Sequence, residues 1–339
     1  MGDLPSCRMS KSFPFSYTGV DFCGPFFIKK KKYRNQKRIK IYVSVFICMS
    51  VKPVHLELVS DLTADGFIAA LRRFTSRRGI PNHLYSDNGS NFVGAKNQLT
   101  EVYDMFNSES DKEKFKMFAQ KNQIQWHFIS PAASHFGGLW ESSVKIFKYH
   151  LYRVVGDSLS TYEEFHTLTT EIEGVLNSRP ITSLSSDPND LEALSPGHFL
   201  TGRPITFIPQ ENLEAIPENR LSKWQHIYKV SQDFWKRWSS EYLNELQVKG
   251  KWWKDGVNIK TGELVLIKNK NLPCSQWMMG RVLKTHPGHD GVVRAVTLRT
   301  TSGELQRAVN YICPLPMTST LNQYTLCSKG KKKSDSLLT

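Results

Sequence analysis

Three apolar runs rich in β-branched residues follow one another closely near the start of the sequence, at Gly19–Ile28, Ile39–Met49 and Val54–Val59. Runs of this length with short connections favour an antiparallel meander of strands. Thr63 is placed to cap a following helix that runs to about Arg78. This order constrains the fold, because a three-stranded meander followed by a helix is the beginning of a layered α/β domain.

Short strands alternate with helices in the next part of the sequence. His83–Ser86 and Ile124–Ile129 are predicted strands, and a polar, helical segment separates them from about Val93 to Lys121. Helical periodicity returns from Gly137 to Val155 and from Tyr162 to Asn177. The predicted fold of this part is therefore an α/β layer with a mixed sheet flanked by helices.

The second half of the sequence changes character twice. The part before about Pro217 is rich in Pro, Asp and Asn, which predicts loops. Leu221–Leu246 predicts a long amphipathic helix whose aromatic stripe packs against the core or a second chain. The stripe consists of Leu221, Trp224, Tyr228, Ser231, Trp235, Trp238 and Tyr242. From Trp252 to Leu315, apolar runs separated by turn residues predict a small all-β barrel.

These patterns predict five consecutive regions. They are an N-terminal linker, an α/β core, a loop with the long helix, a small β-barrel domain, and a basic tail expected to be disordered. Their predicted ranges are 1–16, 17–185, 186–250, 251–316 and 317–339.

The charge of the chain predicts a polyanionic partner, because its formal net charge is +14. No apolar run approaches the roughly 20 residues of a membrane-spanning helix, so we expect nucleic acid and no membrane. No charged-then-apolar leader is present, so we do not expect secretion. The six cysteines form no CxxC pair, so we expect reduced thiols. His286 and His289, with Cys313 and Cys327, are weak candidates for zinc ligands, since the HPGH segment is read more simply as a turn.

Three acids occur where folding alone does not call for them. Asp21 interrupts an apolar strand, where an unpartnered carboxylate is costly to bury. Asp87 ends a short strand at a strand-to-helix turn. Glu141 lies near the start of a helix, on a stripe that it shares with Lys145 and Lys148.

Each acid also has a purely structural interpretation. Asp87 is equally explained as an Asx-turn or helix cap, and Glu141 as a first-turn acid favoured by the helix dipole. Together, however, Asp21, Asp87 and Glu141 form a set of hard oxygen ligands that suits Mg²⁺ or Mn²⁺. Two such ions can activate a water or 3′-hydroxyl and stabilise the leaving oxygen of a phosphodiester, so the protein needs no nucleophile of its own.

The sequence motifs around the three acids resemble those of a known family. VDFCGPF, SDNGSNFVGA and SPAASHFGGLWESSVK look like the acid-bearing motifs of retroviral and retrotransposon integrases. NSRPIT and LSPGHFLTGRP most resemble the BEL/Pao group of long-terminal-repeat retrotransposons, as does the C-terminal part from KWQHIYKVSQDFWKRW onward. The resemblance covers nearly the whole chain.

The resemblance implies an RNase H-like core with a five-stranded mixed sheet, followed by a small SH3-like domain. It implies that Asp21, Asp87 and Glu141 bind two Mg²⁺ or Mn²⁺ ions, and that Lys145 and Lys148 contact donor DNA. The implied activity is a DNA integrase, a polynucleotidyl transferase that processes the 3′ ends of element DNA and joins them to target DNA. Homo-oligomers and a nuclear location, cytoplasmic before import, are also implied.

The sequence departs from the family pattern in two places. The second and third acids lie farther apart than in retroviral integrases, and the extra length falls in the polar segment Asn97–Lys121. Family members also begin with a His-His-Cys-Cys zinc module, and nothing here supplies it, since MGDLPSCRMS resembles the join just after that module. We therefore expect a polyprotein fragment, a gene model started at an internal Met, or a host-captured derivative.

Other functions stay open at this point. A catalytically inactive, integrase-derived DNA-binding or assembly protein is the main alternative, and a ribonuclease H is weaker because its extra acids have no clear motif here. The run Lys29–Lys40 holds eight Lys or Arg, and is either a phosphate-tracking or nuclear import segment or a solvated hairpin tip. In the β domain, six cations form a candidate phosphate-binding surface, although strand-face solubility explains them nearly as well. They are Lys268, Lys270, Arg281, Lys284, Arg294 and Arg299.

Overall fold

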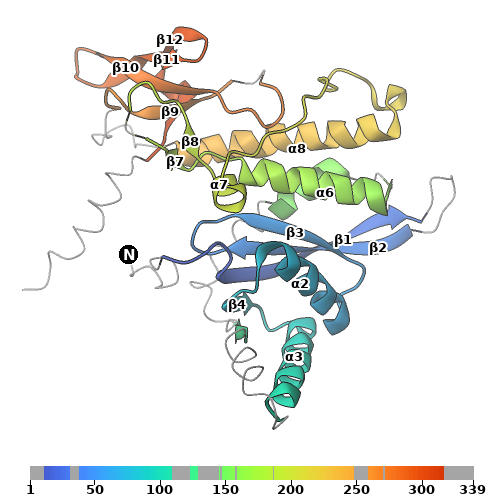
Figure 1. Cartoon of the computed structure of the whole chain (residues 1–339). Coiled ribbons are helices and arrows are strands. Elements are labelled where there is room, and N and C mark those ends of the chain that lie inside the picture. The colour runs from blue at the N-terminus through green and yellow to red at the C-terminus, as the bar shows by residue number, and fades with distance from the viewer. Residues whose placement is uncertain are drawn as a thin grey trace, which may run out of the picture. The chain divides into compact units, whose positions relative to one another are not determined.

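The computed structural model describes residues 11–30, 38–108, 123–128, 145, 147–156, 159–185, 187–247, 259–269 and 272–316. The chain forms two compact units. The first contains the described residues up to Asn177 together with 199–205 and 211–235. The second contains 178–198, 206–210 and the described residues from Lys236 onward. Each unit is described by itself below (Figure 1).

The first unit is built on a mixed sheet with the strand order β3-β2-β1-β4-β5. β2 runs antiparallel to β1 and β3, whereas β4 is parallel to β1 and β5 is parallel to β4. The strands are β1 Tyr17–Lys29, β2 Arg38–Cys48, β3 Val54–Val59, β4 His83–Ser86 and β5 Gln125–Phe128. This order of three antiparallel and then parallel strands confirms the predicted mixed sheet and is the arrangement of an RNase H-like fold.

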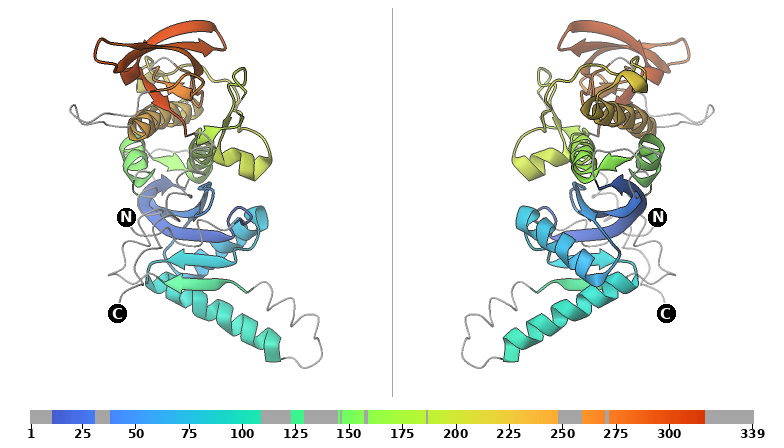
Figure 2. Two further views of the ribbon diagram at one scale, coloured as in Figure 1. Left: turned by 90° about the vertical axis from the view of Figure 1, so that its left-hand side faces the viewer. Right: turned by 90° about the vertical axis from the view of Figure 1, so that its right-hand side faces the viewer.

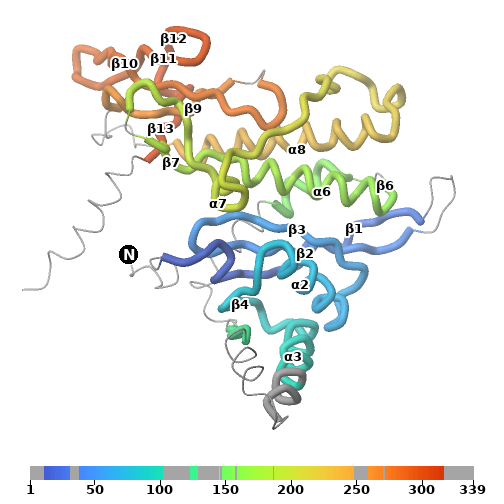
Figure 3. The backbone as a smooth tube through the Cα atoms, in the orientation of Figure 1, coloured from blue at the N-terminus to red at the C-terminus, as the bar shows by residue number. Residues whose placement is uncertain are grey.

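The sequence pattern did not predict a further strand of this sheet. β6, Ser160–Thr161, pairs in parallel with Ile28 and Lys29 at the far end of β1 (Figure 3). Two residues are too short to leave an alternating pattern. The same Thr161 also begins the following helix, α6 Tyr162–Asn177, because its hydroxyl accepts from the Glu164 N–H and the Glu164 carboxylate accepts from the Thr161 N–H. This reciprocal capping box fixes the predicted start of α6.

Two helices cover one face of the sheet. α2, Ala64–Arg78, begins as predicted, since the Thr63 hydroxyl accepts the Gly66 N–H at 3.0 Å. It ends at Gly79, whose φ of 89° is costly for other residues. α3, Ser90–Ser108, follows β4 and lies at the β4–β5 side of the sheet (Figure 2). The core on this face is aromatic, and each buried ring contributes roughly 1.5–3 kcal/mol. Its largest members are Phe15, Phe46, Phe67, Phe74 and Phe92.

The opposite face is covered by α6 and by a helix over residues 147–155, named here the 147–155 helix. Phe26 of β1 contacts Phe165 of α6 and Tyr152 of the 147–155 helix, with ring centroids 5.3 and 4.8 Å apart. Asp21 lies on this face too, because its neighbour Phe22 packs against Phe67 of α2 on the other face and the register of β1 shifts between Cys23 and Phe26. Figure 1 shows α2 and α6 on opposite sides of the sheet.

α6 also closes the exposed edge of the sheet at β3. The side-chain amide of Asn177 donates to the Val54 carbonyl and its oxygen accepts the Val54 N–H, both at 2.8 Å. Glu173 accepts the Leu56 N–H at 2.8 Å, and Arg73 of α2 donates to the Leu58 carbonyl at 2.6 Å. Side chains therefore satisfy backbone groups that would otherwise be open to pairing with another strand.

The long helix α8, Lys223–Leu246, confirms the amphipathic prediction. It begins two residues later than predicted because Ser222 and Gln225 form a capping box, in which each side chain accepts the other's backbone N–H. Trp235 and Trp238 of the predicted stripe are buried, and three further residues join the packing face. They are Ile227, Val230 and Phe234. α8 contributes its residues to Trp235 to the first unit and the rest to the second.

The second unit contains an antiparallel sheet with the order β12-β11-β10-β9-β13. This confirms the predicted all-β C-terminal domain. The strands are β9 Leu264–Ile267, β10 Met279–Pro287, β11 Val293–Thr300, β12 Gly303–Ala308 and β13 Ile312–Pro314. The HPGH segment ends β10 and enters a turn in which Gly291 has a φ of 74°, as predicted. A 3-10 turn, η2 Val309–Tyr311, leads into β13.

The region between the α/β core and Pro217 was predicted to form loops. It also contains short strands and helices, so that prediction was wrong in part. It contains the two-residue pair β7 Thr182–Ser183 and β8 Ala193–Leu194, and the short helix α7 Pro196–Thr201. A 3-10 turn, η1 Glu218–Arg220, follows. These elements are too short to show periodicity in the sequence. In the part of the chain described, no helix has the length and apolar character needed to cross a membrane.

Candidate active site

Asp21 lies in the middle of β1, as the sequence predicted, on the face opposite α2. Its side chain is 29% exposed, and both of its oxygens have partners. Oδ1 accepts the backbone N–H of Phe22 at 2.7 Å, and Oδ2 accepts from the Lys148 ammonium at 2.8 Å. A cation therefore already lies against this carboxylate, which shows that the position favours positive charge.

Asp87 directly follows β4 and is exposed. Its Oδ1 accepts the Gly89 N–H at 3.0 Å, an Asx-turn that leads into α3 at Ser90. The turn is tight at Gly89, because a Cβ there would lie 2.7 Å from Asn91 Oδ1 and 3.1 Å from Asp87 Oδ1, so a larger residue would displace these side chains. The structural interpretation of Asp87 as a turn residue is thus correct, and the turn leaves its other oxygen available to a ligand.

The pairing of β1 with β4 relates the positions of the two aspartates. The strands are parallel, with Tyr17 opposite His83 and Gly19 opposite Tyr85. Asp21 lies two residues after Gly19, and Asp87 lies two residues after Tyr85. Because paired residues of parallel strands project to the same face, we expect the two carboxylates to face one site.

The third predicted acid, Glu141, lies outside the described residues. The helix predicted to carry it is described at Lys145 and from Phe147 onward. Phe147 and Leu151 are buried, so this side of the helix packs into the core, and Lys145 is exposed. Lys148 points to the sheet and pairs with Asp21, so the structure joins two predicted site residues that are 127 positions apart in the sequence.

The donor chemistry of this site fits a hard divalent cation. Aspartate oxygens on adjacent strands are the ligands that Mg²⁺ and Mn²⁺ prefer. Within the described residues no group of three potential metal ligands is found, and Glu141 is not among those residues. Cys23, two positions after Asp21, does not extend the ligand set, because burial raises the pKa of its thiol to about 12 and keeps it neutral.

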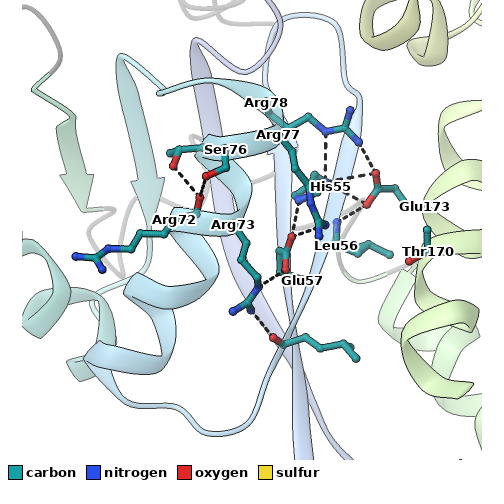
Figure 4. A network of polar contacts seen from close by, with 12 residues as sticks. His55, Leu56, Glu57, Arg72, Arg73, Ser76, Arg77, Arg78, Thr170 and Glu173 are labelled. Atoms are coloured by element: carbon teal, nitrogen blue, oxygen red, sulfur yellow. Dashed lines mark hydrogen bonds and ion pairs between the residues drawn. The ribbon is translucent and has the colours of Figure 1, made fainter. Parts of the chain in front are cut away.

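A second charged cluster, which the sequence did not reveal, lies between β3, α2 and α6 (Figure 4). His55 contacts Glu57 through Nε2 at 3.0 Å and Glu173 through Nδ1 at 3.2 Å. Three arginines of α2 complete it, and we call the six residues the His55 network. Arg73 and Arg77 pair with Glu57 at 2.6 and 2.9 Å, and Arg78 pairs with Glu173 at 2.6 Å.

The pKa values of the His55 network follow from this pairing. Burial alone lowers the pKa of His55, but the hydrogen bonds to Glu173 and Glu57 outweigh burial and leave it raised. Burial raises the pKa of both glutamates, and the contacts with His55 and the arginines outweigh it and leave both values lowered. The two carboxylates therefore favour the protonated form of His55, an arrangement that stabilises the fold.

The basic residues of the second unit have mixed outcomes. Arg281 is 2% exposed and donates to the Gly262 carbonyl at 3.0 Å and to the Asp190 carbonyl, so its assignment to a phosphate-binding surface was wrong. Arg294 pairs with Asp290 at 2.6 Å. The weak zinc prediction finds no support in the described residues, because the Cys313 thiol is buried and donates to the Leu243 carbonyl. Burial raises its pKa to about 11.

Comparison with known proteins gives one family match and several structural neighbours. Residues 222–315 match a family of unknown function (DUF5641), and no curated protein matches the sequence. A simian T-cell lymphotropic virus intasome in complex with PP2A regulatory subunit B56 gamma is 13% identical, covering 90% of this chain and 80% of that one, with a TM-score of 0.36. The HTLV-2 integrase catalytic core domain in complex with magnesium, in its trimeric form, is 17% identical. That match covers 56% of this chain and 97% of that one, with a TM-score of 0.33. Because these TM-scores are low, the fold is assigned from the strand order of the first unit.

Proposed function

We propose that the chain is the catalytic and C-terminal part of a retrotransposon integrase of the BEL/Pao type, a divalent-metal-dependent polynucleotidyl transferase. The proposal is based on the parallel register of β1 and β4, which predicts that Asp21 and Asp87 face one site, and on the Lys148 ammonium that pairs with Asp21. The sequence motifs around Asp21, Asp87 and Glu141 support the same family.

In this proposal Asp21, Asp87 and Glu141 hold two Mg²⁺ or Mn²⁺ ions. When bound, the ions supply the Lewis acidity that activates water or a 3′-hydroxyl at a phosphodiester. β1 and the Asp87 turn hold two of the carboxylates on a rigid sheet, which limits their reorganisation during the reaction. The HTLV-2 integrase core solved with magnesium is consistent with this choice of ion.

Lys148 has two roles in the proposal. It neutralises Asp21 as an ion pair, and it contacts a DNA phosphate when a metal ion takes over the carboxylate. Lys145, exposed one helical turn before it, contacts DNA in the same way. The substrates are the element's DNA ends and target DNA, the working form is a homo-oligomer, and the site of action is the nucleus.

Cleavage of DNA tests this function directly. The purified chain is incubated with an end-labelled duplex that carries the terminal sequence of its element, with Mn²⁺ or with EDTA. We expect Mn²⁺-dependent release of nucleotides from the 3′ end and joining of the shortened strand to other DNA. Asp87→Asn abolishes both reactions.

A matched control separates the metal role of Asp87 from its turn role. Asp187 is also exposed and accepts the N–H of the residue two positions later, Asn189, at 2.8 Å. Asp187→Asn is expected to leave cleavage unchanged. DNA binding without cleavage by the chain with intact Asp87 would instead favour the alternative, a catalytically inactive DNA-binding or assembly protein.

A further inference from the structure

The 147–155 helix has an exposed side that the metal chemistry does not use. No acidic residue occurs between Lys145 and Val155. The buried side of the helix consists of Phe147, His150, Leu151 and Val155. On the other side, Lys145, Tyr149 and Arg153 follow one another at four-residue spacing, which places them in one row along the helix.

Two aromatic rings are exposed in this row and beside it. Tyr149 is 46% exposed and Tyr152 is 43% exposed, which is unusual for rings of this size on a helix that packs into a core. Arg153 lies over the Tyr149 ring, with its guanidinium carbon 3.7 Å from the ring centroid, and Nη1 donates to the Tyr149 hydroxyl. The two contacts hold the guanidinium and the ring together.

Tyr152 is fixed from the other side. Its ring stacks on Phe26 of β1 at 4.8 Å with 27° between the planes. Phe26 lies five residues after Asp21 on the same strand, and Lys148, which binds Asp21, precedes Tyr152 by one helical turn. Because a helix rises 1.5 Å per residue, Arg153 lies only about 8 Å along the axis from Lys148. The exposed rings therefore lie on the same helix as Lys148, within two turns of the residue that pairs with Asp21.

We propose that Tyr149, Tyr152 and Arg153 form a stacking platform for unpaired bases of a DNA strand held at the acidic site. The inference rests on the proposed function and deepens it, because it specifies DNA with a single-stranded end as the preferred substrate form. Unpaired bases stack on aromatic rings and on guanidinium groups, whereas a paired duplex offers such a surface only its phosphates. Cations without nearby acids on the helix complement the charge of the strand.

Binding of two matched DNA probes tests the platform. Both carry the same fluorophore and the same duplex, and one has in addition a short 5′ single-stranded extension. Affinities are measured by fluorescence anisotropy with the full chain bearing Asp87→Asn and with EDTA present, so that no cleavage occurs. Tyr149→Ala is expected to weaken binding of the extended probe about tenfold, the size of one lost base stack, and of the blunt probe less than twofold.

Three further variants make the result specific. Tyr149→Phe keeps the ring and is expected to keep the preference for the extended probe. Arg153→Ala is expected to lower the salt dependence of binding, whereas Tyr149→Ala leaves it unchanged. Tyr162→Ala is the control, because Tyr162 is 53% exposed and also stacks on a residue one turn later, His166. It is expected to bind both probes like the parent chain.

Equal losses of Tyr149→Ala on both probes would overturn the proposal in favour of a backbone contact. No loss on either probe, or competition by an acidic peptide as strong as by DNA, would overturn it as well. Failure of the proposed function is a different result, namely a chain with intact Asp87 that binds DNA and does not cleave it with Mn²⁺. The two failures are therefore distinguishable.

Discussion

Two charged clusters lie on the same sheet and differ in how their carboxylates are partnered. In the His55 network, Glu57 is 3% exposed and contacts His55, Arg73 and Arg77. At the candidate active site, Asp21 is 29% exposed and pairs with Lys148, while Asp87 is exposed. The difference indicates that groups of the fold surround the carboxylate of Glu57, whereas the two aspartates are accessible to solvent.

The energetics of the two clusters differ for the same reason. A buried carboxylate that loses its partners pays the full cost of desolvation, so removing one member of a buried network is strongly destabilising. A half-exposed ion pair contributes little to stability, because water solvates both groups when they separate. Substitutions should therefore affect folding in the first cluster and activity in the second.

The largest effect is expected from Asp21→Asn. An amide is a poor replacement for an anionic ligand, and bound metal ions supply several kcal/mol of catalysis, so we expect Mn²⁺-dependent cleavage to fall by on the order of a thousandfold. Thermal unfolding should change little. Cleavage assays and melting curves on the same preparation measure both quantities, and a variant that cleaves normally would contradict the assignment of Asp21.

The reverse pattern is expected from Glu57→Gln. Removal of this charge leaves His55 and two arginines without their central anion, so the free energy of unfolding should fall by about 3 kcal/mol. Urea titration followed by circular dichroism measures the change. Glu163→Gln, at an exposed position in the first turn of α6, is the control and should alter stability by less than about 1 kcal/mol. A Glu57→Gln variant as stable as this control would show that the network is not a stabilising unit.

The same two clusters show what the sequence can and cannot predict. Asp21 was selected because a carboxylate interrupts an apolar strand, yet Glu57 interrupts the apolar strand VHLELV in the same way. The local pattern is identical, and only the partners distinguish them. Lys148 lies 127 positions from Asp21, whereas Arg73 and Arg77 lie 16 and 20 positions from Glu57. A single sequence does not give such contacts, and the resemblance of the surrounding motifs, rather than the charge itself, singled out Asp21.

The fold was more predictable than the site because its signals are local. Thr63, Gly79 and the apolar periods lie within a few residues of the helix and strand ends that they determine. Arg281 shows the limit, because a strand residue predicted to face solvent is buried and bound to the carbonyls of Asp190 and Gly262. Its partners come from turns far away in the sequence, and alternation along β10 alone did not reveal them.

A smaller effect is expected at the contact between Asp21 and its cation. If Lys148 competes with a metal ion for Asp21, then Lys148→Met should tighten binding of Mn²⁺ in the absence of DNA. A partly exposed ion pair contributes up to about 1 kcal/mol, which corresponds to about a fivefold change in affinity. Titration calorimetry measures it. Lys145→Met, on the same helix but exposed, is the control, and equal affinities in the two variants would exclude the competition.

The smallest effect, a dependence of stability on pH, is expected from the His55 network. His55 has a pKa raised above the ordinary 6.5, so its contribution is fully present below about pH 6.5 and is lost as the pH rises through its folded value. Glu57 and Glu173 have pKa values lowered below 4.5, so their contributions are present above about pH 4.5 and are lost as the pH falls through their folded values. The network should therefore stabilise the first unit most between about pH 4.5 and 6.5. Urea midpoints measured across this range test the sign, and His55→Asn should remove the decline above pH 6.5, whereas His166→Asn should keep it. The contrary result is a stability that rises from pH 6.5 to 8 in the parent chain and not in His55→Asn. It would mean that His55 is neutral in the folded protein, so that only the arginines neutralise Glu57 and Glu173.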